Sequence, residues 1–217
     1  MRPPLDLSVY LVTDPRLCAG RGLVDTVLAA VRGGATVVQL RDKEAPDGVL
    51  IEQGQALKAA LRGSGVPLIV NDRLEVALAV GADGIHVGQS DAAAAAARAA
   101  LGPGAIVGLS IQTREHAALV DPLVGDYLGV GPVFATETKP DHAPPLGFDG
   151  LAEVCAACRL PAVAIGGLTG DHAAAVLAAG AQGLAVVSAI CGTPDPEDSA
   201  RRLALAVARA RDRAGRA

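Results

Sequence analysis

Short apolar runs recur along the chain, and a segment of helical periodicity separates each run from the next. The runs are nearly continuous in apolar and β-branched residues, which is typical of strands buried on both faces of a parallel sheet. Eight such strands are predicted, at Ser8–Thr13, Thr36–Leu40, Leu68–Val70, Gly84–Val87, Ala105–Gly108, Tyr127–Val130, Ala162–Ile165 and Leu184–Val187.

The intervening segments carry apolar residues at three- and four-residue spacing, as amphipathic helices do. They include Leu23–Val31, Leu50–Leu61, Leu74–Val80, His116–Val120 and His172–Ala179, with a further surface helix at the alanine-rich run 92–100. Glycine follows several of them, as is usual where a helix closes in the left-handed conformation.

This alternation, at a period of roughly 25 residues, predicts an α/β fold, a single-domain (β/α)₈ barrel spanning residues 1–217. A doubly wound open sheet is the structural alternative. Such a sheet usually shows a GxGxxG fingerprint after its first strand, whereas this chain continues with Thr13-Asp14-Pro15.

Composition excludes several classes of protein. The chain is 51% hydrophobic but only 2% aromatic, so its core must be aliphatic, and its net charge of −4 argues against a general nucleic-acid binder. We find no signal-peptide pattern and no uninterrupted apolar stretch of about 18 residues, so no membrane span is expected. Cytoplasmic location is the resulting expectation.

The four cysteines include one CxxC pair, Cys155 and Cys158. A zinc site would need a second ligand pair, which is missing, and a redox motif would lie at a strand-to-helix turn rather than inside a helical pattern. We interpret both as packing residues in a reducing compartment.

Polar residues gather after the predicted strands, where the active sites of barrel enzymes lie. Gln39, Arg41 and Lys43 alternate at the end of the second strand and should project to the same side. Two cations in a barrel mouth indicate anion binding; a solvated charged loop is the alternative.

Asp72 and Asp91 follow the third and fourth strands. Two carboxylates on neighbouring loops suit Mg²⁺, which completes its coordination with water and substrate phosphate. The alternative for each aspartate is a role as N-cap of the helix that follows it. On the far side, Gly166-Gly167 and Val187-Ser188 occupy the usual phosphate position of barrels, after strands seven and eight. Two anion sites suggest two phosphorylated substrates, or one substrate with two phosphate groups.

The chain closely resembles the thiamine phosphate synthase (thiamine-phosphate pyrophosphorylase) family. The matching segments occur in the family's order: YLVTD (10–14), QLRDK (39–43), IVNDR (69–73), ADGIHVGQSD (82–91), VGLS (107–110), GVGPVFATETKPDHAPPLG (129–147), AIGGL (164–168) and VVSAI (186–190). The resemblance implies a transferase of thiamine biosynthesis. It would join 4-amino-2-methyl-5-hydroxymethylpyrimidine diphosphate to the phosphate ester of 4-methyl-5-hydroxyethylthiazole, releasing thiamine phosphate and pyrophosphate.

The resemblance also implies site residues. Those implied for the pyrimidine diphosphate are Gln39, Arg41, Lys43, Asn71, Ser110 and Lys139. Those implied for the thiazole phosphate are Thr136, Thr138, Gly167, Val187 and Ser188. Asp72 and Asp91 would hold Mg²⁺.

The chemistry fits such a set. Loss of pyrophosphate leaves a pyrimidine methylene cation that the ring can delocalise, so a dissociative substitution needs no strong base or nucleophile. Arg41, Lys43, Ser110 and Lys139 would act catalytically by stabilising the departing pyrophosphate. We favour a structural role for His86 over an acid, because no proton transfer is required.

Two rival functions stay open. One is a sister barrel that isomerises a thiazole precursor, which should not need the diphosphate apparatus. The other is a non-catalytic binding protein, against which the metal carboxylates argue. The length and composition of loop 135–146 are compatible with a lid, and the sequence predicts no oligomeric state.

Overall fold

The eight strands form one closed parallel barrel in this computed structural model, which describes residues 5–88, 91–136 and 144–215. Each strand pairs with the next in sequence, and the last pairs with the first to close the sheet. The strands are β1 Val9–Val12, β2 Val37–Leu40, β3 Leu68–Asn71, β4 Gly84–Val87, β5 Ile106–Ile111, β6 Tyr127–Val130, β7 Ala162–Ile165 and β8 Leu184–Val186. The predicted barrel is confirmed, and the doubly wound alternative is wrong.

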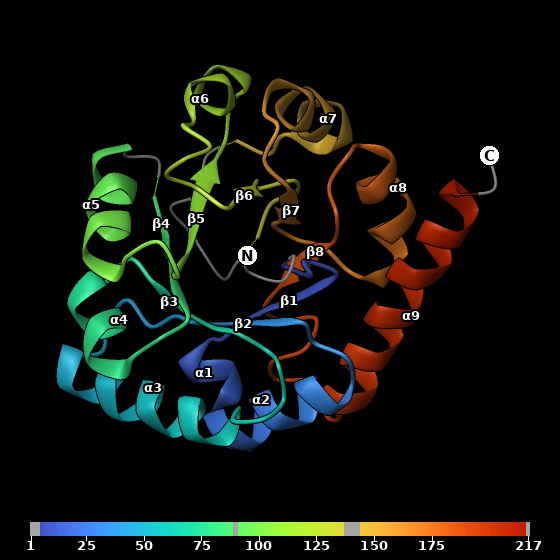
Figure 1. The fold of residues 1–217 in the computed structure, drawn as a ribbon. Coiled ribbons are helices and arrows are strands. Elements are labelled where there is room, and N and C mark those ends of the chain that lie inside the picture. The colour runs from blue at the N-terminus through green and yellow to red at the C-terminus, as the bar shows by residue number, and fades with distance from the viewer. Residues whose placement is uncertain (1–4, 89–90, 137–143, 216–217) are drawn as a thin grey trace.

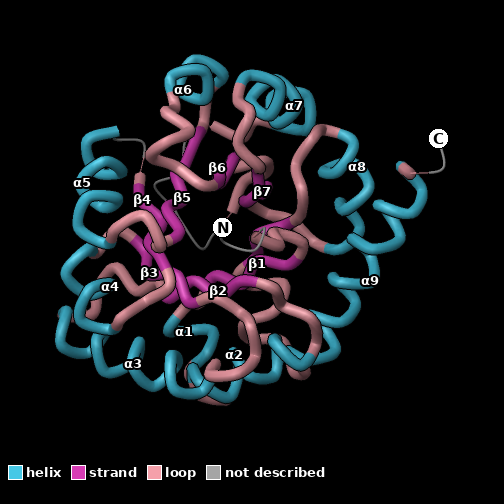
Figure 2. The backbone as a smooth tube through the Cα atoms, in the orientation of Figure 1, coloured by secondary structure: helices cyan, strands magenta, loops and turns pink. Residues whose placement is uncertain are grey.

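The helices surround the barrel as an outer ring, with the strands inside (Figures 1 and 2). They are α1 Pro15–Cys18, α2 Leu23–Arg32, α3 Asp47–Ala60, α4 Leu74–Val80, α5 Asp91–Leu101, α6 Arg114–Leu119, α7 Gly147–Ala157, α8 Ala173–Ala178 and α9 Pro196–Ala214, with a 3₁₀ turn, η1 Gly170–His172, before α8. Among the described helices, none is both long enough and apolar enough to cross a membrane.

Alternation along the strands divides the core into two layers. In β1, Val9 and Leu11 face the helices, whereas Tyr10 and Val12 belong to a smaller cluster inside the barrel. Tyr127 of β6 lies in the same inner cluster. Both tyrosines are therefore enclosed by the sheet itself.

Two strands are longer than the apolar runs suggest. The sequence predicts the fifth strand to end at Gly108, yet β5 continues to Ile111, which pairs with Val130 of β6. Likewise, β3 includes Asn71, which pairs with His86 of β4. Asn71 and Ser110 are thus held inside paired strands rather than in loops, and this fixes their backbones.

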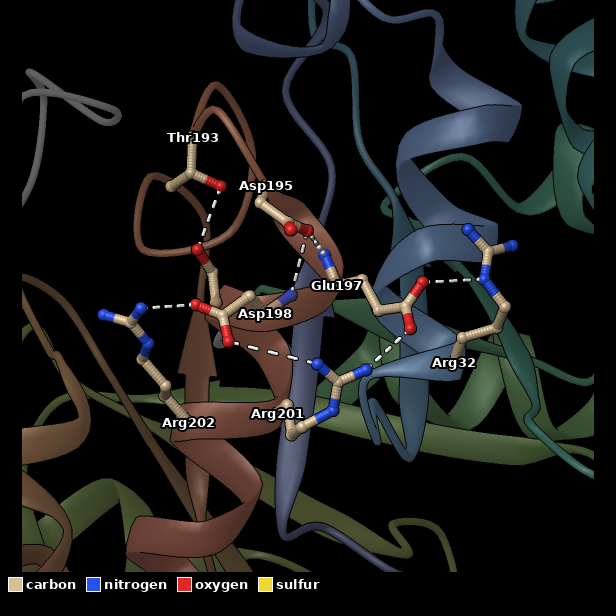
Figure 3. Close-up of polar contacts among 8 residues, drawn as sticks. Arg32, Thr193, Asp195, Glu197, Asp198, Arg201 and Arg202 are labelled. Carbon is tan, nitrogen blue, oxygen red and sulfur yellow. Dashed lines mark hydrogen bonds and ion pairs between the residues drawn. The ribbon is translucent and has the colours of Figure 1, made fainter.

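The C-terminal helix α9 packs against α2 and α8 and so joins the end of the ring to its beginning. Asp195 caps it, because its carboxylate accepts hydrogen bonds from the backbone N–H groups of Glu197 and Asp198. Glu197 accepts from Arg32 of α2 at 2.9 Å and from Arg201 one turn along α9 at 2.6 Å, as Figure 3 shows. These ion pairs are exposed, so they orient the helices more than they stabilise them.

Candidate functional site

A cavity of about 470 Å³ opens at the carboxyl ends of the strands. Its walls come from residues at or just beyond the ends of every strand, which is where barrel enzymes place their active sites. Most of the predicted site residues line it: Gln39, Arg41, Lys43, Asn71, Asp72, Ser110, Thr136, Gly167, Val187 and Ser188. Residues implied for both substrates therefore share one cavity.

One wall of the cavity is charged. Gln39 is 5% exposed, Arg41 is half-buried and Lys43 is exposed, and all three line the cavity as their alternation predicts. The N–H of Arg41 donates to Thr13 Oγ1 at 3.0 Å, and the N–H of Thr13 donates to the Gln39 carbonyl at 2.9 Å. These bonds tie the end of β2 to the end of β1 and fix where Arg41 leaves the barrel.

Asp72 adds a carboxylate to this wall in an unusual backbone conformation. Its φ is 59°, the left-handed region, and it is the one non-glycine residue with positive φ in the described part of the chain. Its N–H donates to the His86 carbonyl at 2.8 Å, which anchors it to β4. A non-glycine residue is held in this region only where its surroundings impose it, and such residues cluster at functional sites.

The capping alternative is wrong for Asp72. The N-cap of α4 is Arg73, and no hydrogen bond from the helix to the Asp72 carboxylate occurs among the described residues. Asp91 is the first residue of α5, but its side chain lies outside what the structure describes, so its cap and metal interpretations both remain predictions.

The opposite wall is neutral and built largely from backbone. Gly166 and Gly167 follow β7 with φ of 105° and 63°. A Cβ on Gly166 would lie 2.6 Å from Pro132 Cβ, and one on Gly167 would lie 2.9 Å from Phe134 Cβ. Only glycine allows this turn to pack so closely on the loop after β6, which explains the Gly-Gly pair seen in the sequence.

Two predicted substrate contacts, one to the thiazole phosphate and one to the pyrimidine diphosphate, fall outside the described residues. These are Thr138 and Lys139 in the loop after β6. The suggested lid, 135–146, is also largely outside, because residues 137–143 are not described. Both points stay predictions.

A continuous row of hydrogen bonds crosses the floor of the cavity. Gln39 Nε2 donates to Tyr10 Oη at 2.8 Å, and Tyr10 Oη lies 2.6 Å from Tyr127 Oη. Tyr127 Oη lies 2.9 Å from His86 Nδ1, and His86 Nε2 lies 3.0 Å from Ser110 Oγ. Burial raises the pKa of both tyrosines above their ordinary value, so their hydroxyls stay protonated and available as donors.

The sequence alone did not predict a role for the two tyrosines of this row. A signal was present, because Tyr10 and Tyr127 are the only tyrosines of the chain and both stand in strands. A buried tyrosine hydroxyl normally needs a hydrogen-bond partner, so polar neighbours inside the barrel were to be expected. His86, predicted to be structural, lies between Tyr127 and Ser110 and connects them.

The cysteine pair is far from this cavity. Cys155 and Cys158 line a separate cavity at the other end of the barrel, among residues that precede strands, such as Pro67 and Pro161. Burial raises the pKa of the Cys155 thiol to about 11, which disfavours the thiolate needed for metal or redox chemistry. Within the described residues, no group of three or more His, Cys, Asp or Glu side chains forms a metal cluster. The location of the pair and the raised pKa of Cys155 support the packing interpretation.

Comparison with known proteins gives a consistent result. Residues 9–190 match the family model described as thiamine monophosphate synthase. The thiamine-phosphate synthase of Xanthobacter autotrophicus is 55% identical, over 97% of this chain and 100% of that relative. The corresponding protein of Azorhizobium caulinodans is 52% identical over 94% of this chain and 96% of its own length.

Solved structures agree. The thiamine phosphate pyrophosphorylase from Pyrococcus furiosus superposes with a TM-score of 0.84 at 35% identity, covering 95% of this chain and 98% of that one. A 3-hexulose-6-phosphate synthase, at 18% identity and a TM-score of 0.64, covers 92% of this chain and 99% of its own. The second likeness shows the barrel fold alone.

Proposed function

The chain belongs to the thiamine monophosphate synthase family, and on that premise we propose that it condenses an aminopyrimidine methyl diphosphate with a thiazole phosphate, as the sequence resemblance implies. It is a transferase of thiamine biosynthesis. The products would be thiamine phosphate and pyrophosphate. One observation carries the proposal: a single cavity joins a charged wall, with Arg41 and Lys43, to a neutral wall, with Gly167 and Ser188.

The charged wall suits the diphosphate. In a dissociative substitution the C–O bond to the diphosphate breaks first, and negative charge grows on the leaving pyrophosphate. Fixed positive groups and hydrogen-bond donors stabilise such charge where it develops. Arg41, Lys43 and Ser110 would supply this stabilisation, joined by Lys139, while Gln39 and Asn71 position the pyrimidine.

Asp72 and Asp91 would hold Mg²⁺. Mg²⁺ usually takes one or two protein carboxylates and fills its shell with water and substrate phosphate, so a three-residue protein cluster is not required. Asp72 fits this role, because it lines the same cavity as Arg41 and Lys43 and its backbone N–H is anchored to the His86 carbonyl. When bound, the ion would neutralise part of the diphosphate charge.

The neutral wall suits the thiazole phosphate. Thr136, Thr138, Gly167, Val187 and Ser188 would offer hydroxyl and backbone N–H donors to the phosphate. The thiazole nitrogen is already nucleophilic and has no proton to lose. The enzyme therefore needs only to hold the two rings within bonding distance. We extend the proposal to a single catalytic domain over the whole chain, working in the cytoplasm.

The test is to incubate the protein with both substrates, with and without Mg²⁺, and to measure thiamine phosphate and pyrophosphate. We expect equal amounts of the two products, formed only with Mg²⁺. Isomerised thiazole alone would favour the sister barrel, and binding without turnover would favour a non-catalytic protein. Either result would overturn the proposal.

A further inference from the structure

The hydrogen-bonded row beneath the cavity connects two residues that both line it. Gln39 and Ser110 stand at its ends, and Tyr10, Tyr127 and His86 lie between them. We propose that this row couples recognition of the substrate at Gln39 to hydrogen-bond donation by Ser110. The three inner residues are then positioning residues that act through Ser110, and this inference rests on the proposed function.

The direction of the row follows from counting hydrogens. Gln39 donates its amide hydrogen to Tyr10, so the single Tyr10 hydrogen turns to Tyr127. We take His86 as the neutral imidazole, so the Tyr127 hydrogen goes to Nδ1 and the ring hydrogen lies on Nε2. His86 Nε2 donates to Ser110 Oγ, which leaves the Ser110 hydrogen to donate into the cavity.

Rotating the Gln39 amide by half a turn, together with a change of the His86 tautomer from Nε2–H to Nδ1–H, would reverse every bond in the row. His86 lines the cavity, so its ring hydrogen can exchange with water there. Gln39 would then accept a hydrogen bond from Tyr10, and Ser110 would donate its hydrogen to His86 instead of to a ligand. The hydrogen bonds of the row can thus all point from Gln39 toward Ser110 or all point the other way, and we call these two directions its polarities. The group that binds to the Gln39 amide selects one of them. Hydrogen bonds in such a buried chain strengthen one another, which favours the two uniform polarities over mixed ones.

The proposed substrate selects the productive polarity. An aminopyrimidine carries an exocyclic amino group, a donor that suits the Gln39 carbonyl oxygen. With that oxygen occupied, the amide nitrogen faces Tyr10 and Ser110 becomes a donor. A donor hydroxyl is what the departing diphosphate needs, because its oxygens gain negative charge. No proton is transferred to the substrate and the row gains no charge; the His86 tautomer and the direction of donation are what change.

Local packing holds the row in place. A Cβ on Gly129 would lie 2.8 Å from His86 Cε1, and a Cβ on Gly108 would lie 2.5 Å from His86 Nδ1. Tyr10 and Tyr127 are 1% and 0% exposed, with ring centroids 5.8 Å apart. The glycines of β5 and β6 therefore make room for His86 and Tyr127, and a side chain at either position would displace them.

Tyr127→Phe tests the coupling, because it removes one hydroxyl from the middle of the row and keeps the ring. We expect kcat for thiamine phosphate formation to fall by about tenfold, with KM for the pyrimidine diphosphate changed less than about twofold, since Ser110 acts mainly on the developing charge. In a Ser110→Ala background the same change should alter kcat by less than about twofold. A full, additive loss in that background would overturn the proposal.

Thr26→Val is the matched control. Thr26 is 1% exposed, and its hydroxyl donates to the Gly22 carbonyl at 2.8 Å on α2, away from the cavity. The substitution removes a buried, hydrogen-bonded hydroxyl, as Tyr127→Phe does. It should change the melting temperature but not kcat. If Tyr127→Phe does not fold, Tyr10→Phe interrupts the row at the next bond and is judged by the same comparisons.

Titration with inorganic pyrophosphate and Mg²⁺ separates this inference from the proposed function. Tyr127→Phe and Ser110→Ala should each weaken pyrophosphate binding by roughly fivefold, and together by no more than either alone. Unchanged affinity in Tyr127→Phe, with weaker binding in Ser110→Ala, would refute the coupling even if the enzyme is active. If the wild-type protein binds pyrophosphate and the variants weaken binding as expected, but no thiamine phosphate forms, only the proposed function is refuted.

Discussion

Replacing Gly108 with alanine should lower both stability and activity, because the added methyl group has no room. The new Cβ would lie 2.5 Å from His86 Nδ1 and closer still to Cζ and Oη of Tyr127. Tyr127 is fully buried and packs against Tyr10, so its ring can retreat only by displacing a second ring. The strain must therefore fall on the floor of the cavity.

The magnitude follows from the overlap. Ordinary carbon contacts are about 3.5–4.0 Å, so the methyl group would overlap its neighbours by roughly 1 Å or more. Overpacking of this kind costs about 1–3 kcal/mol, and the rigid surroundings place Gly108→Ala near the upper end. For a chain of 217 residues this corresponds to a fall in melting temperature of roughly 6–12 °C.

Activity should fall with it. The bonds of the row span 2.6 to 3.0 Å, and a displacement of about 0.5 Å carries most of them to the limit of hydrogen-bond geometry. Losing one such bond in the transition state slows turnover by roughly tenfold. Gly108→Ala should therefore resemble Tyr127→Phe in kcat while being less stable.

Thermal unfolding and the thiamine phosphate assay measure the two effects. Gly104→Ala is the matched control, since Gly104 shortly precedes β5 and a Cβ there meets nothing within 4 Å. It should keep full activity without a lower melting temperature. If Gly108→Ala behaved like Gly104→Ala in both measurements, the tightly packed floor would be the wrong explanation.

Three further substitutions test separate parts of the molecule. Asp72→Asn keeps a residue type that tolerates the left-handed backbone but removes the charge, so product formation should fall by about 100-fold or more at an unchanged melting temperature; normal turnover would argue against a metal role. Asp195→Ala should lower the melting temperature at pH 7 and less so near pH 3. The hydrogen bond from the Asp198 backbone lowers the pKa of Asp195, so its stabilisation is present at neutral pH and is lost as the pH falls through that lowered pKa; equal shifts at both pH values would contradict this. Cys155→Ala combined with Cys158→Ala should leave turnover and metal content unchanged, and a loss of either would revive the CxxC motif.

The barrel was predictable because both faces of its strands are buried. β4, β6 and β7 begin and end where their apolar runs do. The prediction ended the fifth strand too early, because the apolar run is broken near Ser110. Backbone pairing does not depend on side-chain polarity, and the neighbouring strands carry β5 on to Ile111.

The charged residues of the cavity could be predicted from the sequence, whereas the hydrogen-bonded row could not. The charged residues follow strand ends, so their sequence positions alone bring them to one mouth, and Arg41, Lys43 and Asp72 are found there. The row is different, because Tyr10 and Tyr127 are 117 positions apart and meet only when the sheet closes. The left-handed conformation of Asp72 was equally hidden, since its backbone is anchored by a hydrogen bond to His86 on the neighbouring strand.

Depth within the barrel explains why the charged and neutral groups are separated. A polar group enclosed by the sheet must find its partner inside, and an enclosed charge would cost far more. The interior accordingly holds neutral groups that satisfy one another, from Gln39 to Ser110, while Lys43 and Asp72 lie exposed at the rim. A diphosphate bound at the rim and an uncharged ring bound above the row would each meet the groups suited to them. In that arrangement the pyrophosphate would leave toward the charged rim and water, while the pyrimidine ring would stay above the uncharged row.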